Sequence, residues 1–495
     1  MHARPAQEHP STPESASPAP ATPSAWLAIT SCGFALMLSL SAFTLWGISA
    51  ILSAAGSWPW AAHELSAYCL PANVGTFFAY GLLAARWERL STVRPTIAAC
   101  AALALGALVF LAAWSGLASM QSLLPVAGIL LGSGGALAFI CWELTFATGS
   151  THNARKAILL ASVLSTIPYC ALAFVPRTIM VPLLTVALVP ACIALLLVAW
   201  RCIPCPAPLP AEDLPPRVQR YASLWSDTWA PLACTMMLGV VGPAIGSYAS
   251  LEPMSDVLRT LLYQLANVAA VGVLALCWFK MRKRPTIESA FLVLAPIAVV
   301  ALFLFPFWSH GYQGVVLAFG CFIFSLVSIL MMVLCIQLSQ RHRVGLGIVY
   351  GFFAAGTYLA QILGGFLGQV VAGSDYPRQF QVIAIIVLLL WGLSVIGLLA
   401  MWRMRLIART AASDEPATAD PVATRCAALS HAHGLTPRET EVLELIGRGR
   451  DANAIAEILC LSRNTVRTHI QRLYADLNVH TRQELIDLLE QTDIE

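Results

Sequence analysis

Charged residues are scarce in this chain: of its 495 residues only 11% are Asp, Glu, Lys or Arg, whereas 58% are hydrophobic. That balance excludes an ordinary soluble domain, in which about a quarter of the residues are charged. The 14 cysteines stand singly, mostly inside apolar runs, and so predict no disulfide framework. No basic cluster precedes the first apolar run, so we expect residues 1–25, rich in Pro, Ser and Ala, to be a disordered tail and not a cleaved signal sequence.

Signatures of catalysis and of tightly held cofactors are missing as well. The sequence contains no nucleotide-binding loop, no zinc-binding His-Glu signature and no nucleophile elbow. Cys202 and Cys205 have CxxC spacing, but neither a second pair nor a nearby His accompanies them. We therefore expect a protein that is not an enzyme, with no metal site and no cofactor.

Long apolar runs are abundant, each of about 20 residues and thus long enough to cross a bilayer. The close pair at 156–200 is broken only by Pro176 and Arg177. Twelve spans are predicted, at 26–54, 62–85, 95–115, 120–147, 156–176, 178–200, 229–250, 257–279, 286–307, 313–338, 344–372 and 379–402.

The charges of the loops test this count, because Lys and Arg accumulate on cytoplasmic loops. Alternate loops, together with the segment after the last span, hold 17 Lys and Arg residues near 86–94, 155–156, 201–220, 280–284, 341–343 and 403–409. The opposite loops hold three, Arg177, Arg259 and Arg378. The alternation predicts a multi-pass protein of the bacterial inner membrane with both termini in the cytoplasm.

The longest connection, 201–228, is rich in Pro and divides the spans into two sets of six. The second span is followed by Gly81-Leu82-Leu83-Ala84-Ala85-Arg86-Trp87-Glu88-Arg89. Together these features resemble the major facilitator fold, whose motif at this place is Gly-x-Leu-Ala-Asp-Arg-x-Gly-Arg, and imply a cavity between the two halves. Ala85 replaces the Asp of that motif and Glu88 its second Gly. Because the Asp helps to latch the cytoplasmic gate of transporters, these departures argue against alternating access.

Few polar residues lie inside the spans, and they are the candidates for binding a ligand. For the uncharged ones the alternative is a helix-packing hydrogen bond or an interface belt. The scarcity of membrane carboxylates favours binding over pumping. Three pairs of glycines four residues apart, Gly128 with Gly132, Gly347 with Gly351 and Gly364 with Gly368, predict close helix packing. The ligand candidates are Glu143, Asn73, Gln264, Asn267, Trp142 and Gln361.

Between residues 435 and 495 the pattern changes to four short helices. Thr436 and Glu439 have the spacing of a capping box, and Asp451, Ser462 and Thr481 are placed to cap the next three helices. The junction between the second and third helices is tight. This layout is a helix-turn-helix, in which the third helix enters the major groove of DNA.

The third predicted helix carries side chains suited to DNA between its buried positions. Arg can grip guanine or phosphate, Asn and Gln can read adenine, and a Thr methyl can touch thymine. The candidate DNA-binding residues are Arg463, Asn464, Thr465, Arg467, Thr468, Gln471 and Arg472.

The whole stretch resembles the LuxR-type DNA-binding domain. By that resemblance Arg467, Thr468 and Gln471 occupy the main base- and phosphate-contacting positions, and the domain binds paired half-sites as a homodimer. Seven Arg and no Lys against eleven acidic residues give residues 435–495 a net charge of 7 − 11 = −4, so any positive face is local. The matching landmarks are Leu435-Thr436-Pro437-Arg438-Glu439, Val442-Leu443, Gly449, Ile455-Ala456, Leu459, Ser462, Thr465-Val466, His469, Leu477, Val479 and Arg482.

We predict an all-α chain with four parts: a disordered tail (1–25), a twelve-helix transmembrane sensor domain (26–402), a juxtamembrane linker (403–434) and a four-helix DNA-binding domain (435–495). The predicted function is a membrane-anchored one-component transcription regulator, whose partners are promoter DNA, the lipid bilayer and a small-molecule ligand of unknown identity. One alternative is a solute transporter of the major facilitator type with a regulatory tail. Another is a tail that binds protein instead of DNA.

Overall fold

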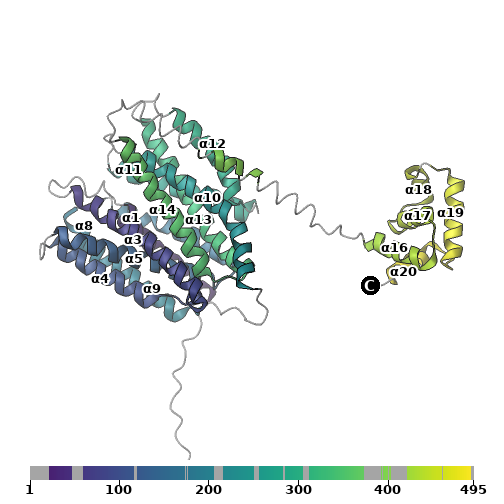
Figure 1. The fold of residues 1–495 in the computed structure, drawn as a ribbon, viewed down its shortest axis with the longest axis horizontal. Coiled ribbons are helices and arrows are strands. Elements are labelled where there is room, and N and C mark those ends of the chain that lie inside the picture. Colours follow the sequence, from purple (N-terminus) through teal and green to yellow (C-terminus); the bar gives the residue numbers. More distant parts are fainter. Residues whose placement is uncertain are drawn as a thin grey trace, which may run out of the picture. The chain divides into compact units, whose positions relative to one another are not determined.

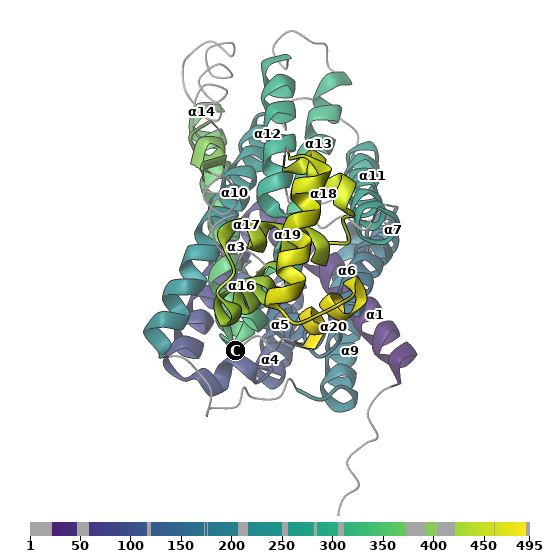
Figure 2. The ribbon, with the colours of Figure 1, turned by 90° about the vertical axis from the view of Figure 1, so that its right-hand side faces the viewer.

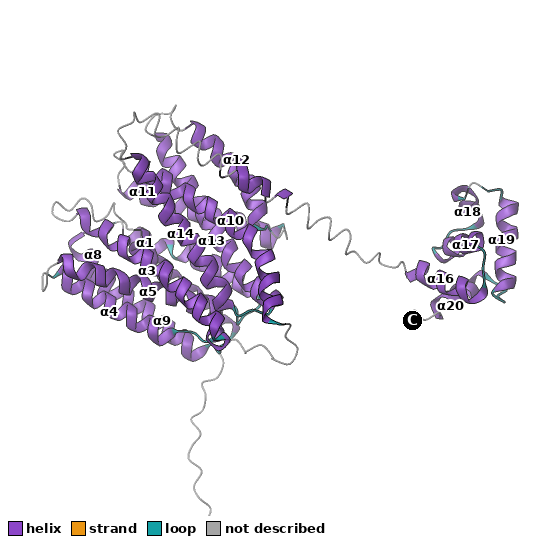
Figure 3. Ribbon diagram, in the orientation of Figure 1, coloured by secondary structure: helices purple, strands orange, loops and turns teal. Residues whose placement is uncertain are grey.

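The computed structural model separates the chain into two compact units, Met1–Met401 and Trp402–Glu495. Its described residues form helices and loops and contain no strand, which confirms the predicted all-α class (Figure 3). The described residues are 22–46, 59–115, 120–172, 174–175, 177–205, 216–249, 256–281, 285–304, 311–372, 392, 394–399, 401–402, 421–459 and 461–491.

The first half of the membrane bundle follows the first six predicted spans (Figure 1). The fifth span is divided in two near Ser165, because Pro168 has no N–H to continue the helical hydrogen bonds. The elements are α1 (Pro23–Trp46), α3 (Pro59–Arg86), η1 (Glu88–Thr92), α4 (Thr96–Trp114), α5 (Met120–Phe146), α6 (Thr151–Leu164), α7 (Thr166–Leu172), α8 (Arg177–Leu183), η2 (Leu184–Leu188) and α9 (Val189–Cys202).

The second half follows the next five spans. Nine helices among the residues described in the two halves are long and apolar enough to cross a bilayer. The predicted twelfth span, 379–402, lies almost entirely outside the described residues. The elements are α10 (Arg217–Ala249), α11 (Asp256–Ala275), η3 (Leu276–Lys280), α12 (Ile287–Leu304), α13 (Gly311–His342) and α14 (Leu346–Ala372).

The connection between the halves is shorter than predicted, because α10 begins at Arg217 and so takes in the last twelve residues of the stretch 201–228. The prolines of this stretch end at Pro216, and Pro suits the start of a helix but not its interior. Arg217 and Arg220 therefore stand on the first turn of a helix and not on a loop.

Glycines allow the helices to approach closely both within and between the halves. A Cβ on Gly132 of α5 would collide with the carbonyl oxygen of Cys69 on α3. A Cβ on Gly351 of α14 would lie 2.9 Å from the carbonyl oxygen of Phe77 on α3. The predicted close packing is confirmed at both glycines, and α3 is the helix through which the first half packs on α14 of the second (Figures 1 and 2).

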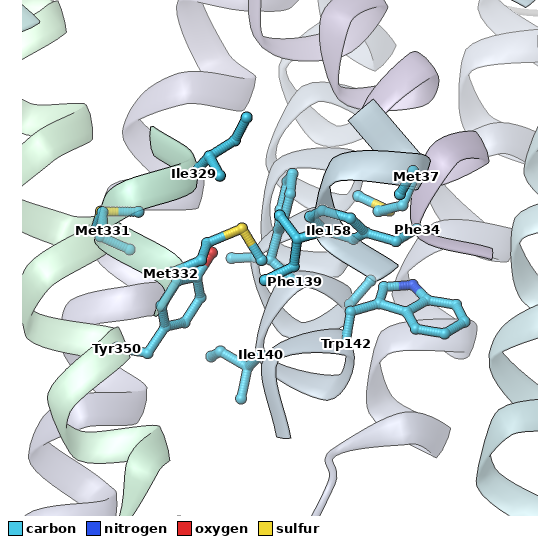
Figure 4. Close-up of a cluster of buried hydrophobic side chains, with 14 of the residues drawn as sticks. Phe34, Met37, Phe139, Ile140, Trp142, Ile158, Ile329, Met331, Met332 and Tyr350 are labelled. Atoms are coloured by element: carbon cyan, nitrogen blue, oxygen red, sulfur yellow. The ribbon is translucent and has the colours of Figure 1, made fainter. Parts of the chain in front are cut away.

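One hydrophobic cluster runs through both halves of the bundle. Figure 4 shows Phe139 of α5 with Phe34 of α1 on one side and Met332 of α13 and Tyr350 of α14 on the other. Apolar and aromatic side chains thus fill this part of the interface between the halves, and any polar group there is enclosed by them.

Among the described residues of the second unit, five helices surround a separate core, one more helix than predicted (Figure 2). Residues 421–433, which the sequence analysis assigns to the linker, form α16. Cys426 and Leu429, three residues apart, share one face of α16 and are buried in the core, against α17 and α20. The helices are α16 (Pro421–His433), α17 (Pro437–Gly447), α18 (Ala452–Ile458), α19 (Arg463–Asp476) and α20 (Arg482–Gln491).

The helix ends of this unit are set by the residues predicted to set them. Thr436 and Glu439 form a complete capping box at α17. The Asp451 carboxylate accepts from the Ala454 N–H at 2.8 Å, and the Ser462 hydroxyl accepts from the Thr465 N–H at 3.1 Å. The predicted caps are confirmed, because each depends only on neighbours along the chain.

Candidate nucleic-acid interface and buried membrane site

The orientation of α19 follows from its two buried residues. Val466 and Leu473 are completely buried, and Leu477 closes the end of the helix against the same core. The side of α19 that carries these three residues faces inward, so the opposite side faces solvent. The core of the unit therefore decides which face of α19 is available to a partner.

All seven candidate DNA-binding residues are exposed on that outer face. Arg463, Arg467 and Gln471 form one row at i, i+4 and i+8, and Asn464, Thr468 and Arg472 form the adjacent row. The Thr468 hydroxyl donates to the backbone carbonyl of Asn464 at 3.0 Å, and the Thr465 hydroxyl is hydrogen-bonded to that of Ser462 at 2.7 Å. The longer Arg, Asn and Gln side chains are thus the polar groups that extend furthest from the helix.

The charge on α19 is positive although the domain is acidic. Three Arg stand on this helix against one acidic residue, Asp476 at its end. On α17, Glu441 pairs with Arg438, and Glu444 pairs with Arg448 at 3.6 Å. The outer face of α19 can therefore attract phosphate groups within a Debye length despite the domain's net charge.

Glu439 connects the start of α17 to α19. The hydrogen bond from the Thr436 hydroxyl and that from the Thr436 N–H, 2.9 Å long, hold the pKa of this carboxyl below its ordinary value. His469 and Arg472 of α19 act on it in the same direction. The carboxylate stabilises the helix end and lies beside the reading helix, but it is buried and does not belong to the outer face.

In the membrane bundle, Glu143 is the most unusual of the ligand candidates. Its side chain is 0% exposed, and within the described part of the chain neither carboxyl oxygen has a hydrogen-bond partner. It lies one turn before α5 ends at Phe146, nearer to the helix end than the predicted span suggested. Across the interface it interacts electrostatically with Cys335 of α13 and Tyr350 of α14.

Three aromatic rings extend inward from this carboxyl along the interface. Tyr350 meets Phe77 of α3 edge to face, with ring centroids 5.7 Å apart. Phe77 stacks on Tyr358 of α14 with the same separation and an interplanar angle of 7°. The three rings thus form one aromatic group to which both halves contribute, and Tyr350 is its member that interacts electrostatically with Glu143.

Asn73 and Gln361 lie further along the same two helices. Asn73 precedes Phe77 by four residues on α3, and Gln361 follows Tyr358 by three on α14. Asn73 donates to the carbonyl of Gly132 at 3.2 Å, while its own Oδ1 has no partner among the described residues. Gln361 is 2% exposed, and neither of its amide atoms has a partner within the same ranges.

The remaining candidates have other surroundings. Asn267 of α11 donates to the carbonyl of Ser162 on α6 at 2.9 Å, a bond between the two halves, and Gln264 is half-buried on α11. Trp142 is buried inside the first half, where a Cβ on Gly33 would collide with its ring, and Figure 4 shows it turned toward Phe34 and Met37. Because successive residues of a helix point about 100° apart, Trp142 cannot share the interface of its neighbour Glu143.

Sequence reasoning missed an ionic link between the two halves. It lies at the end of the bundle that carries residues 86–94, 155, 201–205, 217–220, 280 and 341–343, here called the basic end. Glu88 binds Arg217 at 3.1 Å and Arg220 at 3.2 Å, both on α10. Arg220, 7% exposed, also donates to the backbone carbonyl of Arg343 at 2.8 Å. In the motif after the second span Ala85 replaces the Asp that helps to latch the cytoplasmic gate of transporters. Glu88, three residues later, supplies a carboxylate that binds the other half.

Two further contacts hold the halves together at the basic end. A Cβ on Gly345 would collide with the Ser91 hydroxyl, so the loop before α14 lies directly against η1. On α6 the guanidinium of Arg155 lies over the ring of Trp278 in η3, 5.2 Å from its centroid. At the basic end, η1, which follows α3, therefore contacts both α10 and the loop before α14, and α6 contacts η3.

The two units are similar to different known proteins. Residues 433–489 match the family of bacterial regulatory proteins described as the luxR family. Over 52 residues the chain is 48% identical to the uncharacterized response regulatory protein YgeK of Escherichia coli (strain K12). The aligned stretch is 10% of this chain and 35% of that protein.

For the membrane bundle the similarity lies in the structure. A mutant of the E. coli fucose:proton symporter FucP superposes with a TM-score of 0.52 at 15% identity, covering 77% of this chain and 98% of that one. A mutant of the nucleoside transporter NupG superposes with a TM-score of 0.50 at 8% identity, covering 76% and 99%. At such identities the likeness establishes the fold alone.

The chain is therefore a multi-pass membrane protein of major facilitator-like fold that carries a DNA-binding domain. That domain is a LuxR-type helix-turn-helix, with α18 and α19 as its two helices.

Proposed function

We propose that this protein is a one-component transcription regulator that binds a small molecule between the halves of its membrane bundle and promoter DNA through α19. In this proposal it is a binding protein and not an enzyme. The observation that carries it is the outer face of α19, where seven polar residues are exposed on a helix whose other side is fixed in the core. The unpartnered polar groups in the bundle support a sensing role for the membrane domain.

The proposal places the bundle in the bacterial inner membrane with its basic end and both termini in the cytoplasm. The excess of Lys and Arg on alternate loops supports this orientation. A domain that reads DNA must also be on the cytoplasmic side.

A ligand changes DNA binding only to the extent that its affinity differs between two states of the bundle. The contacts at the basic end define one such state, in which Glu88 and Arg220 hold the halves together. Opening or closing of this end would alter the exposure or the pairing of the DNA-binding domains, since LuxR-type domains bind paired half-sites as dimers.

The test is promoter binding by the full chain in lipid nanodiscs, measured by fluorescence anisotropy with DNA flanking its own gene. Arg467→Ala should weaken binding by about 5- to 150-fold, which corresponds to the roughly 1–3 kcal/mol of one base or phosphate contact. Arg448→Ala is the matched control, because this exposed Arg directly follows α17, where it pairs with Glu444, and is not on α19. Equal binding by wild type and Arg467→Ala would contradict the proposal.

A working transporter is the second candidate, favoured by the ionic link of Glu88 and by the likeness to transporter folds. Uptake of a sugar or nucleoside into proteoliposomes, lost in Glu143→Gln, would support it. If the full chain binds no DNA in the assay above but captures a protein partner, the tail is an interaction module.

A further inference from the structure

The Glu143 carboxyl is buried and lacks hydrogen-bond partners among the described residues. Burying a carboxyl without hydrogen bonds is unfavourable, and a buried carboxylate is tolerated when a cation pairs with it. Both oxygens of Glu143 are without a partner within the described ranges, although the side chain is 0% exposed. The groups that interact with it across the interface, Cys335 and Tyr350, are both uncharged as thiol and phenol.

The cations of the neighbouring helices are already engaged at the basic end. Arg94, before α4, donates to the carbonyls of Ala199 at 3.1 Å and Ile203 at 2.7 Å. Arg155 lies over Trp278, and Arg220 is held by Glu88. None of these contacts reaches Glu143, and no cation of the described residues lies within hydrogen-bonding distance of its carboxyl oxygens.

The wall opposite the carboxyl is aromatic. Tyr350 interacts electrostatically with Glu143, Phe77 meets Tyr350 edge to face, and Tyr358 stacks on Phe77. A carboxylate together with aromatic rings is the combination by which proteins recognise ammonium groups, because the face of each ring also attracts a cation. Asn73 and Gln361, further along α3 and α14, offer hydrogen bonds to a ligand that extends inward.

We propose that the ligand of the membrane bundle is an organic monocation, an amine or quaternary ammonium with an aromatic or apolar body, whose charged group pairs with Glu143 while its body lies against Phe77 and Tyr350. This inference rests on the proposed sensing function of the bundle. The cation would contact Glu143 of the first half and Tyr350 of the second at once, so its binding depends on how the halves are packed and it can report on their state.

The experiment measures binding of three cations, 2-phenylethylamine, benzyltrimethylammonium and tetraphenylphosphonium, to the full chain in nanodiscs by tryptophan fluorescence and thermal unfolding. The neutral isostere 2-phenylethanol and the anion 3-phenylpropionate are measured beside them. At least one cation should bind saturably, and 2-phenylethylamine should bind at least tenfold more tightly than 2-phenylethanol. The absence of saturable binding by all three cations, or equal affinity for the amine and the alcohol, would overturn the proposal.

Glu143→Gln keeps the shape of the side chain and removes its charge, and should weaken cation binding at least tenfold. Glu288→Gln, which removes a carboxylate from the first turn of α12, should leave binding unchanged. Unchanged affinity in Glu143→Gln would overturn the assignment of this residue. If Glu143→Gln does not fold, the comparison of amine with alcohol on the wild-type chain decides the question alone.

The same preparations are assayed for promoter DNA, which separates the two proposals. Cation binding without DNA binding would support the ligand class and refute the regulator. DNA binding without cation binding would support the regulator and refute the ligand class.

Discussion

Replacing Glu88 by Gln would remove the negative charge that binds two arginines of α10 while leaving the shape of the side chain nearly intact. In the wild-type protein this carboxylate binds Arg217 and Arg220, which belong to the other half of the bundle. Arg220 would keep its hydrogen bond to the carbonyl of Arg343 but would lose its counter-ion. The structure therefore predicts that the substitution favours opening of the basic end.

The exposure of the three side chains sets the magnitude. Arg217 is 60% exposed, so its pair with Glu88 contributes about 0–1 kcal/mol. Arg220 is 7% exposed, and a hydrogen bond to a charged partner at such a site is worth roughly 1.5–3 kcal/mol. Gln can still accept one neutral hydrogen bond from Arg220, worth about 1 kcal/mol. Taken near the middle of these ranges, the net loss is about 1–2 kcal/mol, which is a factor of about 5–30 in the equilibrium between the closed and the open basic end.

Hydrogen exchange of the chain in nanodiscs, followed by mass spectrometry, measures this equilibrium through local opening. Peptides that cover residues 217–228 and 341–349 should exchange about 5- to 30-fold faster in Glu88→Gln. Arg89→Gln is the matched control, because it removes a charge from an exposed side chain one residue away. A change of less than about twofold in Glu88→Gln, or an equal change in Arg89→Gln, would refute the reasoning.

Three further predictions concern the two cores and one helix end. Leu473→Ala should destabilise the separately cored domain 421–495 by about 2–5 kcal/mol in urea unfolding, because Leu473 is 0% exposed. Hydrogen bonds from Thr436 lower the pKa of Glu439 from its ordinary 4.5, so the stability they add is present above about pH 4.5 and is lost as the pH falls through the folded-state value. Glu439→Gln should flatten this part of the stability curve, measured by urea unfolding from about pH 3 to about pH 6. Gly132→Ala should reduce the yield of folded membrane protein, whereas Gly75→Ala, where a Cβ meets nothing within 4 Å, should not.

The features that the sequence predicted well are those that depend on neighbours along the chain. The capping residues Thr436, Asp451 and Ser462 act on N–H groups three residues away, so their spacing alone identified the helix starts. The outer face of α19 was predictable because Val466 and Leu473 recur at helical spacing and fix the inward side. The apolar spans follow from the thickness of the bilayer, which sets their length irrespective of how they pack.

Two features of the structure could not be predicted from the sequence because packing decided them. Residues 421–433 look like linker because only Cys426 and Leu429 give the segment an apolar face, yet that face is enough once α17 and α20 lie beside it. The motif after the second span lacks its usual Asp, and the sequence could not show that Glu88 would be within 3.2 Å of Arg220.

The sequence by itself determined the helices, the spans, the loop charges and the chemistry of α19, because each of these depends on residues within a few turns of one another or on the bilayer. Only the tertiary structure decided which side chains meet across the halves. Glu88 and Arg220 are 132 positions apart in the chain. The burial of Glu143, which interacts electrostatically with Tyr350, results from the packing of α5 against other helices, including α14. Such contacts depend on which helices become neighbours, and periodicity along one helix carries no information about the helix that will face it.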